Sequence, residues 1–343
     1  MNALLFRPDF IAQNYNCSGR SYEEWKALGT PNVILGFIYV ILGAIYLALL
    51  LPFMVVFVKS DLMKYSCYKI MFFLGIIDCI ELPIGSFFGG YAAAVGMVYC
   101  MAPITNYIAG NIALACWCSG STTCMLLAIN RCIDLVNPRL GQQIFGGHKT
   151  IWWLMIPVAS FIYFSFIHTT ASFNSNLYAF FFDPFVGTPE RGGLVDSEHY
   201  PHMEHSVHNV VIVIGIFTSY SSLLVYLCIQ TRKSQMSIKT SKIQRQTFIQ
   251  CTMVCLATFV AGVIYVYMQF LPTPMWIVIV GEIAWQTSHG VAGISYAFLN
   301  ATMRKELLKI FCSNYAKTVP FATNTNMKKL AIASTDHISE LHY

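Results

Sequence analysis

The sequence predicts an all-α membrane protein, a bundle of seven transmembrane helices with the N-terminus outside. Of its 343 residues, 56% are hydrophobic and only 11% are charged, whereas a soluble globular domain carries about 25% charged residues. The apolar residues form blocks of about 20, the length that a helix needs to cross the hydrocarbon core of a bilayer. The composition excludes soluble enzymes and nucleic-acid-binding proteins, so neither catalytic residues nor a nucleic-acid partner is expected.

The seven helices are expected where uninterrupted apolar blocks occur. Their approximate ranges are 33–58, 70–94, 103–135, 150–172, 207–230, 247–271 and 275–299. The first block carries no charge before Lys59, and the third carries none between Met101 and Asn130. The fourth opens on the apolar run IWWLMIPV, and only the stretch FLPTPMW separates the sixth from the seventh. Prolines inside a span are tolerated because neighbouring helices re-satisfy the backbone groups that they free.

The distribution of basic residues predicts the orientation. Cytoplasmic loops are enriched in Lys and Arg, and 17 of the 21 basic residues fall in four segments: 59–69, 131–149, 231–246 and the tail from 301. We therefore expect the C-terminus inside. The expected parts are an extracellular tail, the membrane domain, a juxtamembrane helix and a flexible cytoplasmic tail: 1–32, 33–299, 300–312 and 313–343.

Only two of the twelve cysteines, Cys17 and Cys100, fall on the outside in this topology. Because the extracellular space is oxidising, we predict a single disulfide between them, with two free thiols as the alternative. The triplet NCS makes Asn16 an acceptor for N-glycosylation on the same side.

The segment NATMRKELLKIFC, residues 300–312, is expected to form an amphipathic helix along the inner leaflet of the bilayer. Its apolar side would consist of Met303, Leu307, Leu308 and Phe311. Cys312 ends this helix, where a palmitoyl chain could add to the anchor.

Three acids lie inside predicted spans, where ionisable groups are costly and are therefore functional candidates. Asp78 and Glu81 share one face of the second helix, and Glu282 lies in the seventh. These acids could bind a cation, change protonation or hold a buried hydrogen-bond network, and the sequence leaves the three alternatives open.

The stretch HYPHMEHSVH, residues 199–208, spaces four histidines at intervals of three. Imidazole binds zinc and copper and titrates near neutral pH, so a metal or pH-sensing site is one interpretation. Pro201 interrupts a helix here, and we favour the alternative, a polar loop that leads into the fifth helix.

A lone arginine ends the third span. Arg131 in LLAINRCIDL follows thirty positions without any charge, and Asp134 lies one turn further on. From the topology alone, Arg131 could be a membrane anchor whose long side chain extends to the water at the cytoplasmic surface of the bilayer.

Several segments together resemble one branch of the G-protein-coupled receptors, the nematode serpentine receptors of class T. They are YNCS followed by EEW in the tail, SCYKIMFFLGIIDCIELP around the second helix, VYC at 98–100, LLAINRCIDL, and ISYAFLN at 294–300. Together they cover most of the chain, and it is their combination that is specific.

The resemblance implies roles for individual residues. Asn130 and Arg131 stand where rhodopsin-like receptors have an acid and an arginine that holds the resting state and then meets the G-protein. Asn130 cannot supply the acid, so Asp134 is the expected partner of Arg131. Asp78 matches the second-helix acid that binds a sodium ion in that group, and Tyr296 matches the seventh-helix tyrosine that moves on activation.

This chain also departs from the rhodopsin-like pattern. The sixth helix has no Trp-x-Pro motif, GISYAFLN replaces Asn-Pro-x-x-Tyr, and segment 173–206 has no cysteine that could bridge to the third helix.

The expected function is that of a chemosensory G-protein-coupled receptor in the plasma membrane, including that of sensory cilia. It would bind an external small molecule among the outer helix halves and activate a heterotrimeric G-protein inside. Candidate pocket residues, besides Glu282, are Asn106, Asn111, Trp276 and Trp285. The alternative is a transporter or a proton- or ion-conducting protein that uses the three intramembrane acids. A retinal-binding protein is excluded because the seventh helix has no lysine.

Overall fold

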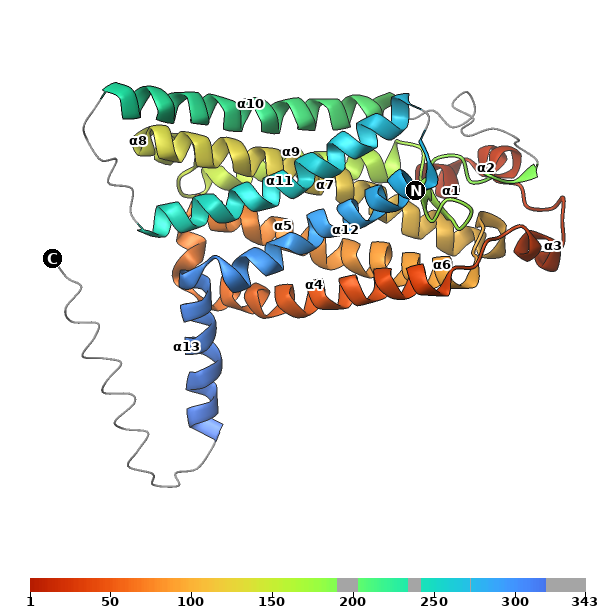
Figure 1. Cartoon of the computed structure of the whole chain (residues 1–343), viewed down its shortest axis with the longest axis horizontal. Coiled ribbons are helices and arrows are strands. Elements are labelled where there is room, and N and C mark those ends of the chain that lie inside the picture. Colours follow the sequence, from red (N-terminus) through yellow and green to blue (C-terminus); the bar gives the residue numbers. More distant parts are fainter. Residues whose placement is uncertain (190–202, 234–241, 272, 319–343) are drawn as a thin grey trace.

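The long helices of the computed structural model run side by side along one axis, and most loops gather at the two ends of the bundle (Figure 1). The structure describes residues 1–189, 203–233, 242–271 and 273–318. The small helices α1 to α3 lie at one end, which we call the disulfide end (Figure 1). The end that carries α8 and α13 is the opposite end.

Seven helical spans make up the bundle, as predicted. In chain order they are α4 (Val33–Lys59), the composite α5–η2–α6 (Ser66–Leu82, Pro83–Phe88 and Gly89–Val95), α7 (Pro103–Val136), α9 (Lys149–Phe166), α10 (Met203–Lys233), α11 (Lys242–Phe270) and α12 (Met275–Phe298). Six of the spans among the described residues are long and apolar enough to cross a membrane. The other, α12, has a similar length but carries buried polar side chains such as Glu282, Gln286 and His289.

The central helix of the bundle is α7. It has 34 residues and is buried over most of its length, because its sequence ALACWCSGSTTC is rich in small side chains that let neighbouring helices approach closely. Ser121, Thr122 and Thr123 satisfy their hydroxyls by donating to backbone carbonyls one turn earlier in the same helix. Apolar faces of α4, α9 and α10 point outward instead, as expected for helices in contact with lipid.

The second span is continuous in direction but not in hydrogen bonding. It changes from α-helix to π-helix over Pro83–Phe88 and returns to α-helix at Gly89. Pro83 has no backbone N–H to donate, and a π segment accommodates the interrupted ladder without ending the helix.

The fourth span is shorter than the predicted 150–172, because α9 ends at Phe166. The chain then forms a hairpin of β1 (Ser172–Asn174) and β2 (Ala179–Phe181), which pair antiparallel. Asn106 of α7 holds this hairpin: its amide donates to the Phe173 carbonyl over 3.0 Å and accepts the Phe173 N–H over 2.8 Å. The Asn106 side chain thus supplies the hydrogen-bond partners that the Phe173 N–H and carbonyl would have found inside a longer helix.

The N-terminal tail is folded onto the disulfide end. It contains α1 (Asn2–Phe6), α2 (Pro8–Asn14) and α3 (Tyr22–Ala27). A disulfide joins Cys17 to Cys100, which lies in the short helix η3 (Tyr99–Met101), so the predicted bridge is confirmed. Around it the aromatic side chains of Tyr15, Trp25, Tyr99, Tyr107 and Phe185 form a small core.

Two local features of the tail follow from its sequence. Ser21 and Glu24 cap α3 reciprocally, and hydrogen bonds from the Ser21 backbone and hydroxyl lower the pKa of Glu24. Asn16 is exposed, which suits the predicted glycosylation.

We expect Cys17→Ser and Cys100→Ser to reduce delivery to the cell surface equally, and the double variant to be no worse than either. The bridge closes a loop across 83 residues, for which loop-closure entropy gives a stabilisation of about 4–5 kcal/mol. Surface biotinylation measures delivery, and Cys79→Ser, which replaces a free thiol, is the control. Clearly different losses in the two single variants would show that the cysteines act separately.

At the opposite end, η1 (Asp61–Lys64) and α8 (Pro138–Phe145) lie between spans, and α13 (Ala301–Thr318) leaves the bundle nearly at a right angle (Figure 1). This direction suits a helix that lies along a membrane surface. The helix continues six residues beyond the predicted end at 312, so 313–318 are not part of a flexible tail.

The predicted apolar side of α13 is divided. Met303 is fully buried and Leu307 packs on the core, whereas Leu308 and Phe311 are exposed. The side chain of Cys312 and residues 319–343 lie outside the described part, so the palmitoylation and the tail remain predictions.

Candidate functional site

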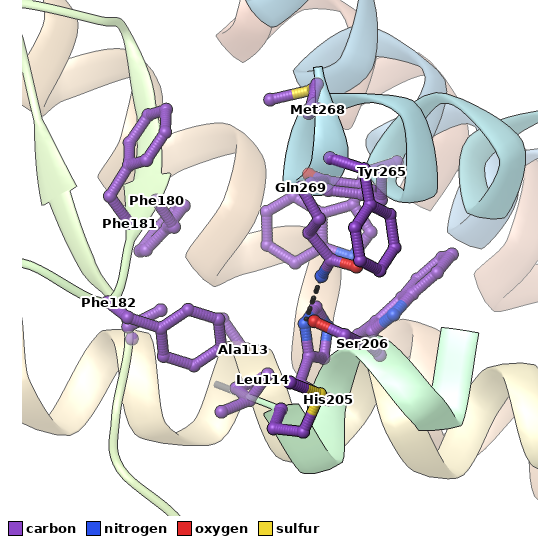
Figure 2. A pocket seen from close by; sticks show the side chains of 16 residues that line it. Ala113, Leu114, Phe180, Phe181, Phe182, His205, Ser206, Tyr265, Met268 and Gln269 are labelled. Atoms are coloured by element: carbon purple, nitrogen blue, oxygen red, sulfur yellow. Dashed lines mark hydrogen bonds between the residues drawn. The ribbon is translucent and has the colours of Figure 1, made fainter. Parts of the chain in front are cut away.

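A cavity of about 500 Å³ lies near the disulfide end, between α7, α10, α11, α12 and the hairpin (Figure 2). This volume falls within the range of small-molecule sites. The lining residues are Gly110, Ala113, Leu114, Trp117, Ala171, Phe180, Phe181, Phe182, Met203, His205, Ser206, Tyr265, Met268, Gln269, Phe270 and Trp285.

The wall nearest the hairpin depends on a close approach of two backbones. A Cβ atom on Gly110 would lie 1.8 Å from the carbonyl oxygen of Ala171, so only glycine fits at this position of α7. Together with the Asn106 bonds, this contact places Phe180, Phe181 and Phe182 opposite Tyr265, Met268 and Gln269 (Figure 2).

The polar part of the wall is small and comes from α10 and α11. The Gln269 amide lies 3.0 Å from Nδ1 of His205 (Figure 2), and Nε2 of His205 lies 3.4 Å from the Asn209 amide. Both histidines of α10 in the predicted polar stretch, His205 and His208, belong to the packed structure, and His208 contacts the Ser121 hydroxyl over 2.9 Å. The interpretation of residues 203–208 as a solvated loop is therefore wrong, and residues 199–202 lie outside the described part.

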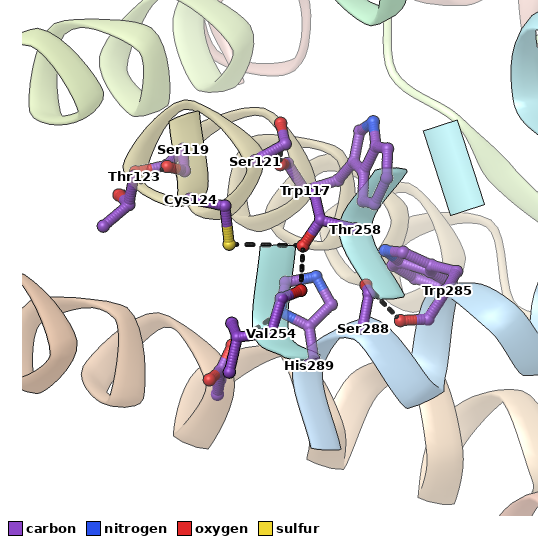
Figure 3. Close-up of polar contacts among 11 residues, drawn as sticks. Trp117, Ser119, Ser121, Thr123, Cys124, Val254, Thr258, Trp285, Ser288 and His289 are labelled. Atoms are coloured by element: carbon purple, nitrogen blue, oxygen red, sulfur yellow. Dashed lines mark hydrogen bonds and ion pairs between the residues drawn. The ribbon is translucent and has the colours of Figure 1, made fainter. Parts of the chain in front are cut away.

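The floor of the cavity consists of aromatic rings that also reach the centre of the bundle. Trp117 lies 5.6 Å from Tyr265 between ring centroids, and the indole of Trp117 donates to Asn209 over 2.9 Å. His289 lies below both tryptophans, with centroids 6.4 Å from Trp117 and 6.2 Å from Trp285. Figure 3 shows Trp117, Trp285 and His289 between α7, α11 and α12, beside the Thr258–Cys124 contact.

The predicted intramembrane acids meet at the bundle centre beneath this floor. Nδ1 of His289 lies 2.8 Å from Oδ1 of Asp78, and both side chains are buried. Glu282 contacts the amide of Gln286, which also bonds to the Ser86 hydroxyl. Neither oxygen of Glu81 has a hydrogen-bond partner within the described part of the chain. Asp78 and Glu81 are thus both on the inward face, as their spacing predicted.

The sodium ion that the resemblance implied at Asp78 stays a prediction. One carboxylate oxygen of Asp78 contacts the His289 imidazole. The other oxygen of Asp78 and both oxygens of Glu81 are buried without a hydrogen-bond partner among the described residues.

At the opposite end, Arg131 is held by its neighbours. Its guanidinium donates to the Asn130 side chain over 3.1 and 2.6 Å and pairs with the Asp134 carboxylate. Asn130 in turn donates to the Ser66 hydroxyl of α5 over 3.1 Å. The arginine is therefore a buried, paired group with only 8% of its surface exposed, and a lipid-facing anchor is excluded for this arrangement.

Two more residues connect α12 to this end. Tyr296 is fully buried, with its ring edge-on to Phe53 and Phe57 at centroid distances of 5.8 and 5.6 Å. Asn300 donates to Gln250 of α11 over 2.5 Å and accepts the N–H of Met303, in the first turn of α13, over 3.0 Å. The sequence alone did not single out Asn300, although an asparagine directly before a helix is a typical N-cap.

The five candidate pocket residues lie in different parts of the structure. Of the five, only Trp285 lines the cavity. Trp276 is 65% exposed on the outside of α12, so its assignment to a pocket is wrong. Asn106 is committed to the hairpin, Asn111 donates to the Ser165 carbonyl of α9, and Glu282 lies in the central cluster. The sequence analysis assigned His205 to a polar loop and did not single out Gln269 or His289, because the role of each residue depends on partners from other helices.

Comparison with known proteins identifies a family whose model matches nearly the whole chain. The model of the serpentine type 7TM GPCR chemoreceptor Srt family matches residues 5–319. The chain is also similar to serpentine receptor class T-55 of Caenorhabditis elegans, with 30% identity over 303 residues that cover 86% of this chain and 80% of the relative.

Proposed function

Because the chain belongs to the Srt family of serpentine seven-transmembrane chemoreceptors, we propose that it is a chemosensory receptor for an external small molecule. The molecule binds in the cavity at the disulfide end and favours a bundle conformation that activates a heterotrimeric G-protein at the opposite end. Membership of the family supports a G-protein-coupled-receptor role in general, and the site assignments are our own.

The observation that carries this proposal is the continuity between cavity and core. Trp117 and Trp285 line the cavity and also contact His289, which bonds to Asp78 of α5. A ligand that binds one arrangement of these rings better than another shifts the equilibrium between the two.

The inner partner site is proposed around Arg131. The guanidinium sits at the end of α7 beside Asn130 and Asp134, and Tyr296 lies in the helix that contacts the same end. A G-protein that binds there would exchange the Asp134 contact for contacts of its own. The basic segment 231–246 would add charge, although residues 234–241 lie outside the described part.

The chain is a multi-pass membrane protein, and we place its disulfide end outside the cell. The disulfide between Cys17 and Cys100 supports this orientation, because the extracellular space is oxidising. The 17 basic residues in segments 59–69, 131–149, 231–246 and the tail from 301 support it too, because cytoplasmic loops are enriched in Lys and Arg. An external chemical cue agrees with a location in the plasma membrane, including that of sensory cilia.

A screen with cells tests the proposal. Cells that express the chain together with a promiscuous G-protein should give a calcium response to at least one compound of a chemically diverse panel, and cells with Leu114→Trp, which fills the cavity, should give none. A parallel measurement in proteoliposomes addresses transport by Asp78, Glu81 and Glu282. Proton or ion flux through the purified chain without any G-protein would overturn the receptor proposal.

A further inference from the structure

We infer that the hydroxyl of Tyr265 binds the polar group of the ligand, and that this ligand is a neutral, mostly apolar molecule with one hydrogen-bond acceptor. The inference rests on the proposed function, since it assigns a contact residue and a ligand class to the same cavity. It follows from the position of Tyr265 on α11 and from the contacts of the other polar side chains in the wall.

Tyr265 lies on the face of α11 that points into the bundle. Positions three or four apart share one side of a helix, and Ala261 and Thr258, the preceding positions at this spacing, are both buried. The Tyr265 ring packs against Trp117 of α7 at a centroid distance of 5.6 Å, and Tyr265 lines the cavity (Figure 2). Accessible surface on this side chain therefore faces the cavity and not the lipid.

The hydroxyl of Tyr265 is accessible and has no hydrogen-bond partner among the described residues. It differs from the hydroxyl of Tyr296, which also lacks a partner in this part of the chain but is sealed inside the bundle. A tyrosine hydroxyl inside a protein usually has a hydrogen-bond partner. A molecule in the cavity can supply that partner here.

The neighbouring polar groups of the wall are engaged or sealed. The indole of Trp117 donates to Asn209 over 2.9 Å, and the ring nitrogens of His205 lie 3.0 and 3.4 Å from amide nitrogens. The indole nitrogen of Trp285 and the side-chain oxygen of Gln269 are buried, so a ligand cannot reach them. The tyrosine hydroxyl is therefore the donor that the described wall offers to a ligand.

The rest of the wall defines the body of the ligand. Among the described residues that line the cavity there is no Lys, Arg, Asp or Glu, so an ionised ligand would lose its hydration without gaining a counter-charge. Phe180 and Trp285 meet edge to face at a centroid distance of 5.5 Å and present apolar surface. A neutral apolar body gains contact with these rings, while a carbonyl on it accepts the phenolic O–H.

Direct binding to the purified full chain in nanodiscs tests this contact without a G-protein. The probe is the neutral naphthyl ketone Prodan, whose fluorescence shifts to longer wavelength when its carbonyl accepts a hydrogen bond. Nanodiscs with Leu114→Trp, which fills the cavity, give the signal of Prodan dissolved in lipid, and this signal is subtracted. We expect the remaining signal to saturate with Prodan concentration.

Tyr265→Phe removes the hydroxyl and keeps the ring. It should weaken Prodan binding about tenfold and shift the emission of bound Prodan to shorter wavelength. The matched control is Tyr267→Phe, the same change on the outer side of α11, where Tyr267 is 38% exposed. This control should change neither the affinity nor the emission, and thermal unfolding verifies that both variants are folded.

Two competitors of Prodan separate the acceptor from the apolar body and from charge. Propylnaphthalene lacks the carbonyl, so its affinity should be the same in the wild-type chain and in Tyr265→Phe. Naphthoate, an anion of similar size, should bind at least about tenfold more weakly than Prodan. Equal weakening of ketone and hydrocarbon by Tyr265→Phe, or an unchanged Prodan signal, would overturn the role of Tyr265. Naphthoate that binds as tightly as Prodan, or a Prodan signal that does not saturate, would overturn the ligand class.

The outcomes also separate this inference from the proposed function. Ketones that bind through Tyr265 but evoke no response in cells would count against the receptor function and leave the contact in place. Cell responses that are the same in Tyr265→Phe and the wild-type chain would keep the receptor function and overturn the contact.

Discussion

Arg131→Ala is expected to abolish G-protein activation while ligand binding persists. The guanidinium makes charge-assisted hydrogen bonds to Asn130 and Asp134 at the end of α7, and each such bond contributes about 1.5–3 kcal/mol. If the G-protein takes over even one of them, its loss lowers activation by at least about tenfold. The cavity is built from other helix segments, so the affinity for a compound that evokes a response in the cell screen should stay within about twofold.

The matched control is Arg139→Ala. Arg139 is exposed on α8 at the same end of the bundle, so this variant removes an equal charge from the same face without touching the α7 contacts. Nucleotide exchange on a purified G-protein, with receptor in nanodiscs, measures the effect. Full activation by the Arg131 variant, or an equal loss in both variants, would rule out a specific coupling role for Arg131.

Asp134→Asn is expected to raise activation, whereas Arg131→Ala lowers it. Asp134 pairs with Arg131, and the amide removes the negative charge while keeping the size of the side chain. With the restraint weakened, basal nucleotide exchange without ligand should rise. A fall would mean that Asp134 supports the active state instead.

His289→Leu is expected to destabilise the bundle by about 2–4 kcal/mol, because Asp78 is left buried without a partner. The two side chains are 211 positions apart in the sequence and 2.8 Å apart in the structure. The double variant Asp78→Leu/His289→Leu removes both polar groups and should recover much of the lost stability, since an apolar pair needs no hydrogen bond.

Thermal unfolding of the full chain in nanodiscs measures this effect. A thiol-reactive fluorophore reports unfolding because free cysteines such as Cys118 and Cys255 are buried in the folded bundle. His148→Leu, which changes an exposed histidine, should leave the unfolding temperature unchanged. If the double variant is less stable than His289→Leu, the two residues are not coupled as a pair.

Several residues were found from the sequence because one property of their own identifies them. Arg131, Asp78 and Glu81 stand out as rare polar groups in apolar blocks, and Cys17 and Cys100 as the two cysteines on the predicted extracellular side. Their immediate chemistry needs no knowledge of the fold, since charge and thiol reactivity belong to the side chain itself.

Other residues were misread because their role is set by what packs against them. Trp276 and Trp285 are the same residue type on the same helix, yet one is 65% exposed and the other lines the cavity. The histidines of residues 203–208 look like part of a polar loop until α11 supplies Gln269 as a partner.

The sequence by itself determined the seven spans, their order, the Cys17–Cys100 disulfide and the family, because hydropathy and local motifs vary along the chain and do not depend on neighbours in space. Three features became visible only in the tertiary structure. The helix α9 ends at Phe166, His289 pairs with Asp78, and His205 and Gln269 form the polar wall of the cavity. Each of these depends on two segments far apart in sequence approaching within hydrogen-bond distance. That approach is set by how all the helices pack at once, which no single stretch of residues encodes.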